Sequence, residues 1–137
     1  MGAIVLFVFA KFAAYSVFCA QAPRWFAFPE PNSVSFGVRW GAARLLIGIA
    51  AGVPIAFIFA MAEDAGLPVF LNYSVSFVPT RYLEWLLLFL FFRASRELPF
   101  GVRANAWILM GVAVSLAFDL VAWTVLEFSN VNLKFFC

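Results

Sequence analysis

Five charged residues lie inside or beside long apolar stretches of the sequence, where a charge must be either paired or functional. They are three cations and two carboxylates: Lys11, Arg44, Arg81, Glu84 and Asp119. A lone charge at the centre of a bilayer costs from about 3 to more than 10 kcal/mol, depending on the method. Opposite charges that face one another relieve most of that cost. These residues are therefore the candidates for intramembrane chemistry.

Arg81 and Glu84 stand three positions apart at the start of the apolar run FVPTRYLEWLLLFLFF. If the helix that ends near Arg93 extends far enough back, they lie about 18 and 13 Å below its end, near mid-bilayer. If the helix instead begins only at Thr80, with Pro79 just before it, both residues form an interfacial ring, because proline suits the start of a helix. The sequence leaves both interpretations open.

Lys11 and Asp119 each fall near the middle of an apolar block. A lysine can reach the membrane surface along its flexible stem, whereas an aspartate cannot. Asp119 is therefore the stronger candidate. We expect it either to anchor neighbouring helices by a hydrogen bond, worth about 1 kcal/mol, or to bind and release a proton.

The composition shows what surrounds these charges. Of 137 residues, 66% are hydrophobic and 12% are charged, against about 45–50% and 25% in globular chains. The four apolar blocks span approximately residues 3–22, 41–61, 75–93 and 106–128, each near the ~20 residues needed to cross a bilayer. We predict an all-α membrane protein, a four-transmembrane-helix bundle in which residues 1–137 form a single integral membrane domain.

The first block could also be a cleaved signal peptide, because AQA before Pro23 has the form of a cleavage site. We expect the block to be retained, since Lys11 divides its apolar run and no basic residue precedes it. The predicted location is a prokaryotic inner or plasma membrane, with the chain crossing it several times.

Basic residues predict the orientation of the four helices. They gather in the first and third connections and at their edges: Arg24, Arg39, Arg44, Arg93, Arg96 and Arg103. Cytoplasmic loops carry such an excess of Lys and Arg. We therefore expect these connections to be cytoplasmic and both termini to be extracytoplasmic. Cys19 and Cys137 then lie on opposite sides, so no disulfide is expected.

Small residues form a stripe on the second predicted helix. At about 100° per residue, four glycines fall within one narrow sector together with Arg44: Gly37, Gly41, Gly48 and Gly52. The fourth block carries a companion stripe that includes Gly111 and Ser115. Such stripes allow helix backbones to approach closely. The two stripes could pack against each other in an interface between the second and fourth helices.

The residue inventory excludes several kinds of chemistry. The chain has no histidine, so the usual haem ligand, the common zinc ligand sets and an imidazole base are missing. No catalytic residue or metal site is predicted, and the sequence does not identify a cofactor. The net charge of +2, without a basic stripe, does not indicate nucleic acid as a partner.

The stretch RYLEWLL resembles the third helix of microbial rhodopsins, where a similar pattern places a carboxylate beside the retinal Schiff base. The resemblance implies that Glu84 is the proton acceptor and Arg81 its modulating cation. It covers about seven of 137 residues, and Leu88, Phe89 and Leu90 replace the Thr-Thr-Pro-like continuation of that family. The chain also has four apolar blocks rather than seven. We therefore interpret the match as a coincidence of sequence.

Three classes of function fit these observations. The favoured one is a structural or assembly subunit that packs in a larger membrane complex. The alternative is a small homo-oligomeric transporter or channel, coupled to protons or ions through the mid-membrane charges, and the second alternative is a membrane enzyme acting on lipid. The expected partners are the lipid bilayer and either other membrane subunits or further copies of the chain.

The orientation is testable with single-cysteine variants and a membrane-impermeant thiol reagent applied to intact cells. A cysteine at Ser33, in the first connection, should resist labelling, whereas Cys137 and a cysteine at Gly66 should react. The reverse pattern would show that the chain is inserted the other way round.

Overall fold

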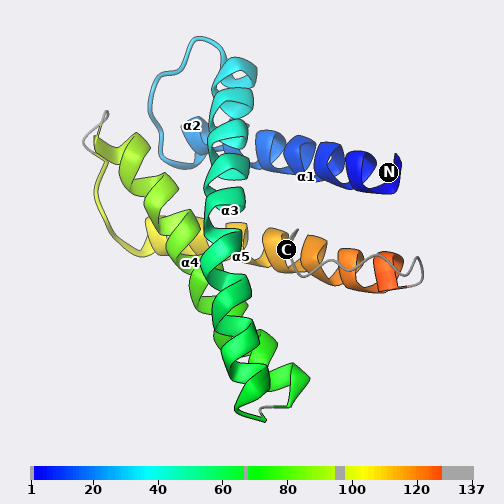
Figure 1. Ribbon diagram of the computed structural model, residues 1–137. Coiled ribbons are helices and arrows are strands. Elements are labelled where there is room, and N and C mark those ends of the chain that lie inside the picture. The colour runs from blue at the N-terminus through cyan, green and yellow to red at the C-terminus, as the bar shows by residue number, and fades with distance from the viewer. Residues whose placement is uncertain (1, 67, 95–97, 128–137) are drawn as a thin grey trace.

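The computed structural model describes residues 2–66, 68–94 and 98–127, and all regular structure in these ranges is helical (Figure 1). Arg96 and Cys137 lie outside them. The helices are α1 (Gly2–Ala20), α2 (Ala22–Trp25), α3 (Ser33–Asp64), α4 (Val69–Ala94) and α5 (Val102–Glu127). Four of the described helices are long and apolar enough to cross a membrane, and only the short α2 is not.

Helix α3 begins at Ser33, earlier than the start near residue 41 expected from hydropathy. The side chain of Asn32 accepts a hydrogen bond from the backbone N–H of Ser35 at 2.9 Å. This is the usual capping contact at a helix N-terminus. The polar sequence after Asn32 therefore belongs to the helix, and Arg44 lies eleven residues inside it rather than near its end.

Helix α4 begins at Val69, well before Thr80. Pro79 lies inside the helix, not in its first turn. Arg81 and Glu84 consequently stand twelve and fifteen residues beyond the helix start, and both are buried. The helix start at Thr80, on which the interfacial interpretation of this pair depends, is therefore wrong.

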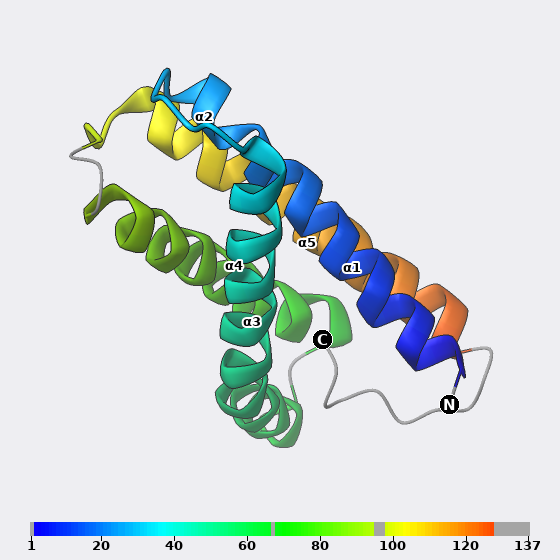
Figure 2. The ribbon, with the colours of Figure 1, turned by 90° about the horizontal axis from the view of Figure 1, so that it is seen from above.

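The long helices cross one another rather than run parallel. Helices α1 and α5 lie side by side in both ribbon views and run in opposite directions, while α3 crosses α1 and continues beside α4 (Figures 1 and 2). At one end, Trp25 donates its indole N–H to the backbone oxygen of Arg103 at 3.1 Å. The first and third connections therefore meet at the same end. The side of the membrane they occupy stays a prediction.

Gly37 and Gly41 of α3 contact α1, not α5. A Cβ atom built on Gly41 would lie 2.5 Å from the Ser16 hydroxyl oxygen and 2.8 Å from the Ser16 Cα atom. Gly37 meets Ser16 and Ala20 as closely. On α5, Gly111 instead receives the ring of Trp85 from α4. The two stripes thus serve different neighbours.

Aromatic rings fill the core between the charged residues and the connection made by α2. Trp85 and Trp107 meet edge to face with their ring centroids 5.3 Å apart, and Phe92 meets Trp107 in the same manner at 5.3 Å. Such edge-to-face pairs are favoured because the positive edge of one ring meets the negative face of the other. This cluster holds α4 and α5 together at that end.

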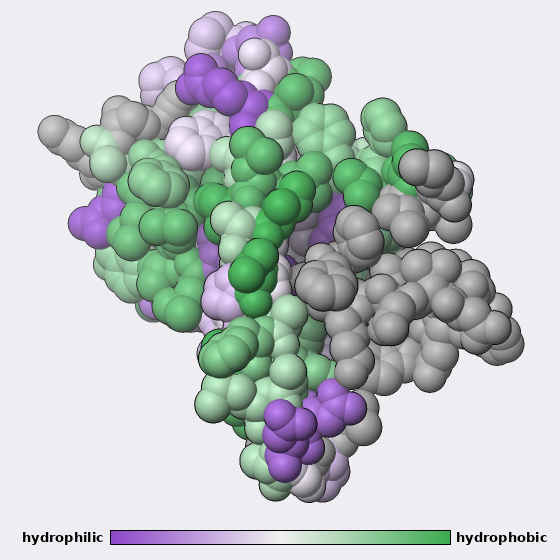
Figure 3. Space-filling view, in the orientation of Figure 1, coloured by the Kyte–Doolittle hydropathy of each residue, from purple (hydrophilic) through white to green (hydrophobic). Residues whose placement is uncertain are grey.

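The outer surface is mainly apolar. In the view of Figure 3, hydrophilic residues gather toward the two extremes of α3, and hydrophobic residues cover most of the surface between them. Four apolar helices and this distribution indicate a multi-pass membrane protein.

The contact between α1 and α3 is testable with two leucine substitutions. Gly41→Leu should destabilise the protein by about 1–3 kcal/mol or more, because a side chain there must push the α1 backbone away. Ile49→Leu, at a position 65% exposed on the same helix, should have little effect. Thermal unfolding in detergent measures both, and equal stabilities would contradict the packing.

Candidate functional site

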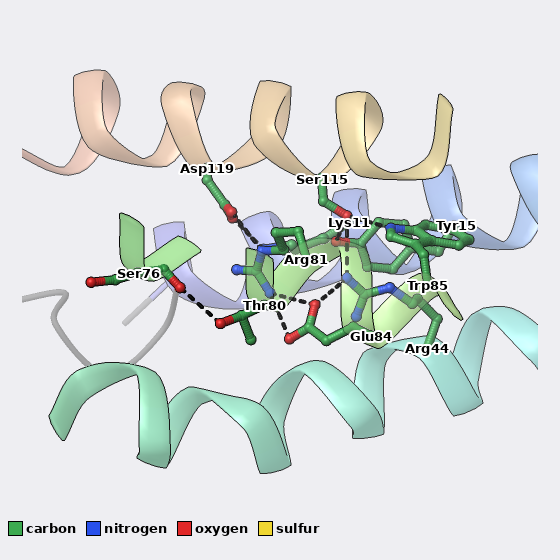
Figure 4. A network of polar contacts seen from close by, with 10 residues as sticks. All are labelled: Lys11, Tyr15, Arg44, Ser76, Thr80, Arg81, Glu84, Trp85, Ser115 and Asp119. Carbon is green, nitrogen blue, oxygen red and sulfur yellow. Dashed lines mark hydrogen bonds and ion pairs between the residues drawn. The ribbon is translucent and has the colours of Figure 1, made fainter. Parts of the chain in front are cut away.

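The five charged residues identified in the sequence come together in one buried network (Figure 4). Each is at most 7% exposed. They come from all four long helices: Lys11 on α1, Arg44 on α3, Arg81 and Glu84 on α4, and Asp119 on α5. The network is therefore the point at which every long helix meets the others.

Asp119 pairs with two cations. Its Oδ1 atom accepts from the Lys11 Nζ atom at 2.7 Å, and its Oδ2 atom accepts from the Arg81 Nε atom at 2.9 Å. Both side chains of the Lys11–Asp119 pair are almost fully buried. Asp119 thus makes ion pairs to two helices, and it does more than supply one hydrogen bond.

Glu84 also pairs with two cations. Arg81, one turn earlier on the same helix, donates from Nη1 to both carboxylate oxygens at 3.0 and 2.9 Å. Arg44 of α3 donates from Nη2 to the Oε2 atom at 2.5 Å. The ion-pair partner of Arg44 is therefore Glu84 on α4.

Ser115 joins the network to the aromatic core. Its hydroxyl oxygen accepts from Arg44 Nη2 at 3.2 Å and from the indole N–H of Trp85 at 2.9 Å. The Tyr15 hydroxyl lies 3.1 Å from the same oxygen. The Arg44 guanidinium carbon stands 5.0 Å from the ring centroids of both Tyr15 and Trp85, so cation–π attraction also holds it.

Tyr15 and Trp85 were not among the residues singled out from the sequence. Each lies four residues from a charged residue of its own helix, as Ser115 does from Asp119. Residues four apart share a helix face. A search for polar or aromatic residues at that spacing from Lys11, Arg81 and Asp119 would have found all three.

The network contains three cations and two carboxylates, so it carries one surplus positive charge when every group is ionised. All four carboxylate oxygens accept hydrogen bonds. In contrast, three guanidinium nitrogens are buried without an acceptor among the described residues: Arg44 Nε, Arg44 Nη1 and Arg81 Nη2. The site is short of acceptors, not of donors.

A line of polar side chains leads along α4 to the network. Asn72, Ser76 and Thr80 follow one another at intervals of four residues. Ser76 donates to the Asn72 side-chain oxygen at 3.1 Å, and the Thr80 hydroxyl donates to the Ser76 backbone oxygen at 2.7 Å. Asn72 also donates to the Phe59 backbone oxygen at 3.0 Å. This polar line runs from the first turn of α4 to Thr80, the residue that precedes Arg81.

The packing glycines divide between the site and the rest of the fold. Gly48 faces the guanidinium groups of Arg44 and Arg81. Gly37, Gly41 and Gly111 serve helix contacts away from the charges, and Gly52 is half-buried. No group of three potential metal-ligating side chains occurs in the part of the chain that the structure describes.

Comparisons with protein-family models, curated proteins and solved structures found no match for this chain. The function must therefore be inferred from the chemistry of the network itself.

The ion pair between Asp119 and Lys11 predicts an asymmetric response to mutation. Asp119→Asn should destabilise the protein by about 3–5 kcal/mol, because it leaves buried cations without a counter-charge. Adding Lys11→Met to that variant should recover part of the loss, because one of the stranded cations is then removed. Chemical denaturation in detergent measures the three variants. Strictly additive effects would show that the two residues do not interact.

Proposed function

We propose that this multi-pass membrane protein is a small transporter or channel in which an ion crosses the membrane by way of the charge network. The observation that carries the proposal is the polar line of α4, which joins one end of the membrane-spanning region to a buried site with surplus charge. The location expected from the sequence, a prokaryotic plasma membrane, is part of the proposal.

The energetics favour a role beyond holding helices together. Replacing a buried ion-pair network by well-packed apolar residues is often neutral or stabilising by about 1–4 kcal/mol. Helices in a membrane can also associate through small residues alone, as α1 and α3 do at Gly37 and Gly41. Five buried charges are therefore more than helix association requires, and intramembrane charges commonly mark an ion pathway.

The proposal includes self-association, because four helices of this length rarely enclose a pathway alone. Helix α3 is the element available for it. In its most apolar window only 6% of the residues are buried within the chain, against 44% for α4. A second copy beside α3 would complete the walls around the network.

Purified protein in liposomes tests the proposal. Thr80→Val removes one hydroxyl of the polar line at nearly constant shape and should lower the ion flux by about tenfold or more, equivalent to roughly 1.4 kcal/mol in the barrier. Val78→Thr, a nearly isosteric change at a position 40% exposed on the same helix, should leave it unchanged. Equal ion flux through both variants would show that the polar line is not part of the pathway.

The assembly-subunit interpretation draws support from the same uncovered helix. Several large apolar side chains of α3 are exposed: Leu46, Ile49, Val53, Phe57, Ile58 and Met61. Unlike chains in place of lipid could cover them. If this interpretation is right, the liposome experiment should show no flux of any ion. The intact mass of the gently extracted particle should then show that it also contains other protein chains.

A lipid-acting enzyme has less support. Both carboxylates of the network are engaged by cations, so neither is available as a general base.

A further inference from the structure

Two buried guanidinium groups have hydrogen-bond donors that nothing in the described chain satisfies. Arg44 is fully buried, yet its Nε and Nη1 atoms have no acceptor, and the Nη2 atom of Arg81 has none either. A buried donor without an acceptor costs about 1–3 kcal/mol, and more when the group is charged. The nearby carboxylates do not remove this cost, because their oxygens accept from other nitrogen atoms: Lys11 Nζ, Arg44 Nη2, Arg81 Nε and Arg81 Nη1.

The two guanidinium groups border one position on α3. A Cβ atom built on Gly48 would lie 3.1 Å from Arg44 Nη1 and 4.0 Å from Arg81 Nη1. Apart from its two chain neighbours and the backbone of its own helix, these are the only heavy atoms of the described residues within 4 Å of that position. Figure 4 shows Arg44 and Arg81 on either side of the Glu84 carboxylate. Because Gly48 has no side chain, no Cβ atom stands against the Nη1 atom of Arg44 at this position.

We propose that a small monovalent anion, of which chloride is the simplest, binds beside Gly48 to the guanidinium groups of Arg44 and Arg81. One negative charge neutralises the one surplus positive charge of the network. The unpartnered Nη1 atom of Arg44 borders this position and supplies a donor for the anion, while the neighbouring Nη1 atom of Arg81 also donates to Glu84. Hydrogen bonds to a charged acceptor are about twice as strong as neutral ones. The further statement that this anion is the transported ion rests on the proposed function; the binding site itself does not.

The charges of the network favour an anion over a cation. A bound cation would raise the surplus from one to two positive charges in a low-dielectric site, where like charges repel strongly. A proton on Asp119 or Glu84 would raise the surplus in the same way and would break an ion pair. The position beside Gly48 is also narrow, because its nearest nitrogen is 3.1 Å from the Cβ position. A single-atom anion therefore fits better than a lipid headgroup.

Thermal unfolding in detergent tests the site, with chloride replaced by gluconate at constant ionic strength. A ligand that binds only the folded protein raises the melting temperature in a saturable manner, so chloride should raise it and gluconate should not. An unfolding temperature that is the same in both anions overturns the proposal, and this measurement needs no variant.

A pair of substitutions at Gly48 adds a second test. Gly48→Asp places a carboxylate beside the same two guanidinium groups, so that the side chain replaces the anion. The variant should lose the chloride effect, with an apparent affinity weaker by about tenfold or more. Gly48→Asn has nearly the same size without the charge and should not stabilise the protein in gluconate as aspartate does. Equal stability of the two variants in gluconate overturns the proposal.

Flux measurements separate this inference from the proposed function. Chloride-dependent stability without any ion flux supports the site and removes the transport function, leaving a bound anion that only completes the network. The opposite result is a protein that transports another ion in chloride-free buffer and whose melting temperature does not depend on chloride. That result overturns the anion site but supports the transport function.

Discussion

A charge placed inside a membrane must be matched by a partner, and that requirement organises the whole chain. Each long helix contributes at least one residue to the network, so no helix can move away without leaving a charge unpaired. Breaking one such pair is far more costly than the pair is stabilising. The network therefore selects one relative placement of the four helices, while apolar packing provides the attraction.

The rest of the structure is divided around this constraint. Gly37 and Gly41 bring the backbones of α1 and α3 together. Lys11 of α1 and Arg44 of α3 can then reach the same network. The aromatic rings around Trp85 and Trp107 fix α4 against α5 at the end of the paired connections. Toward the other end, α4 carries polar side chains instead. The two halves of α4 thus have different roles: one packs against α5 and the other carries the polar line.

The sequence allows the charged residues and the four apolar spans to be predicted, because cost in lipid depends on residue type alone. It does not allow the pairs to be predicted. Whether Arg44 meets Glu84 or Asp119 depends on the crossing of two helices and on where each begins, and the Asn32 cap moved the start of α3 by eight residues. Arg44 therefore became a member of the central network and pairs with Glu84. The polar line was missed because its residues are uncharged.

The length of α3 has a mechanical consequence. A helix of 32 residues is roughly 48 Å long, whereas the hydrocarbon core of a bilayer is about 30 Å thick. Such a helix must tilt strongly or extend into the headgroup region, while the 19-residue α1 nearly matches the core when upright. In the structure α3 crosses α1 rather than lying parallel to it, so the two helices cannot both stand upright in the bilayer. Because Lys11 of α1 and Arg44 of α3 both belong to the charge network, any change in the tilt of α3 relative to α1 would also change the geometry of the charges.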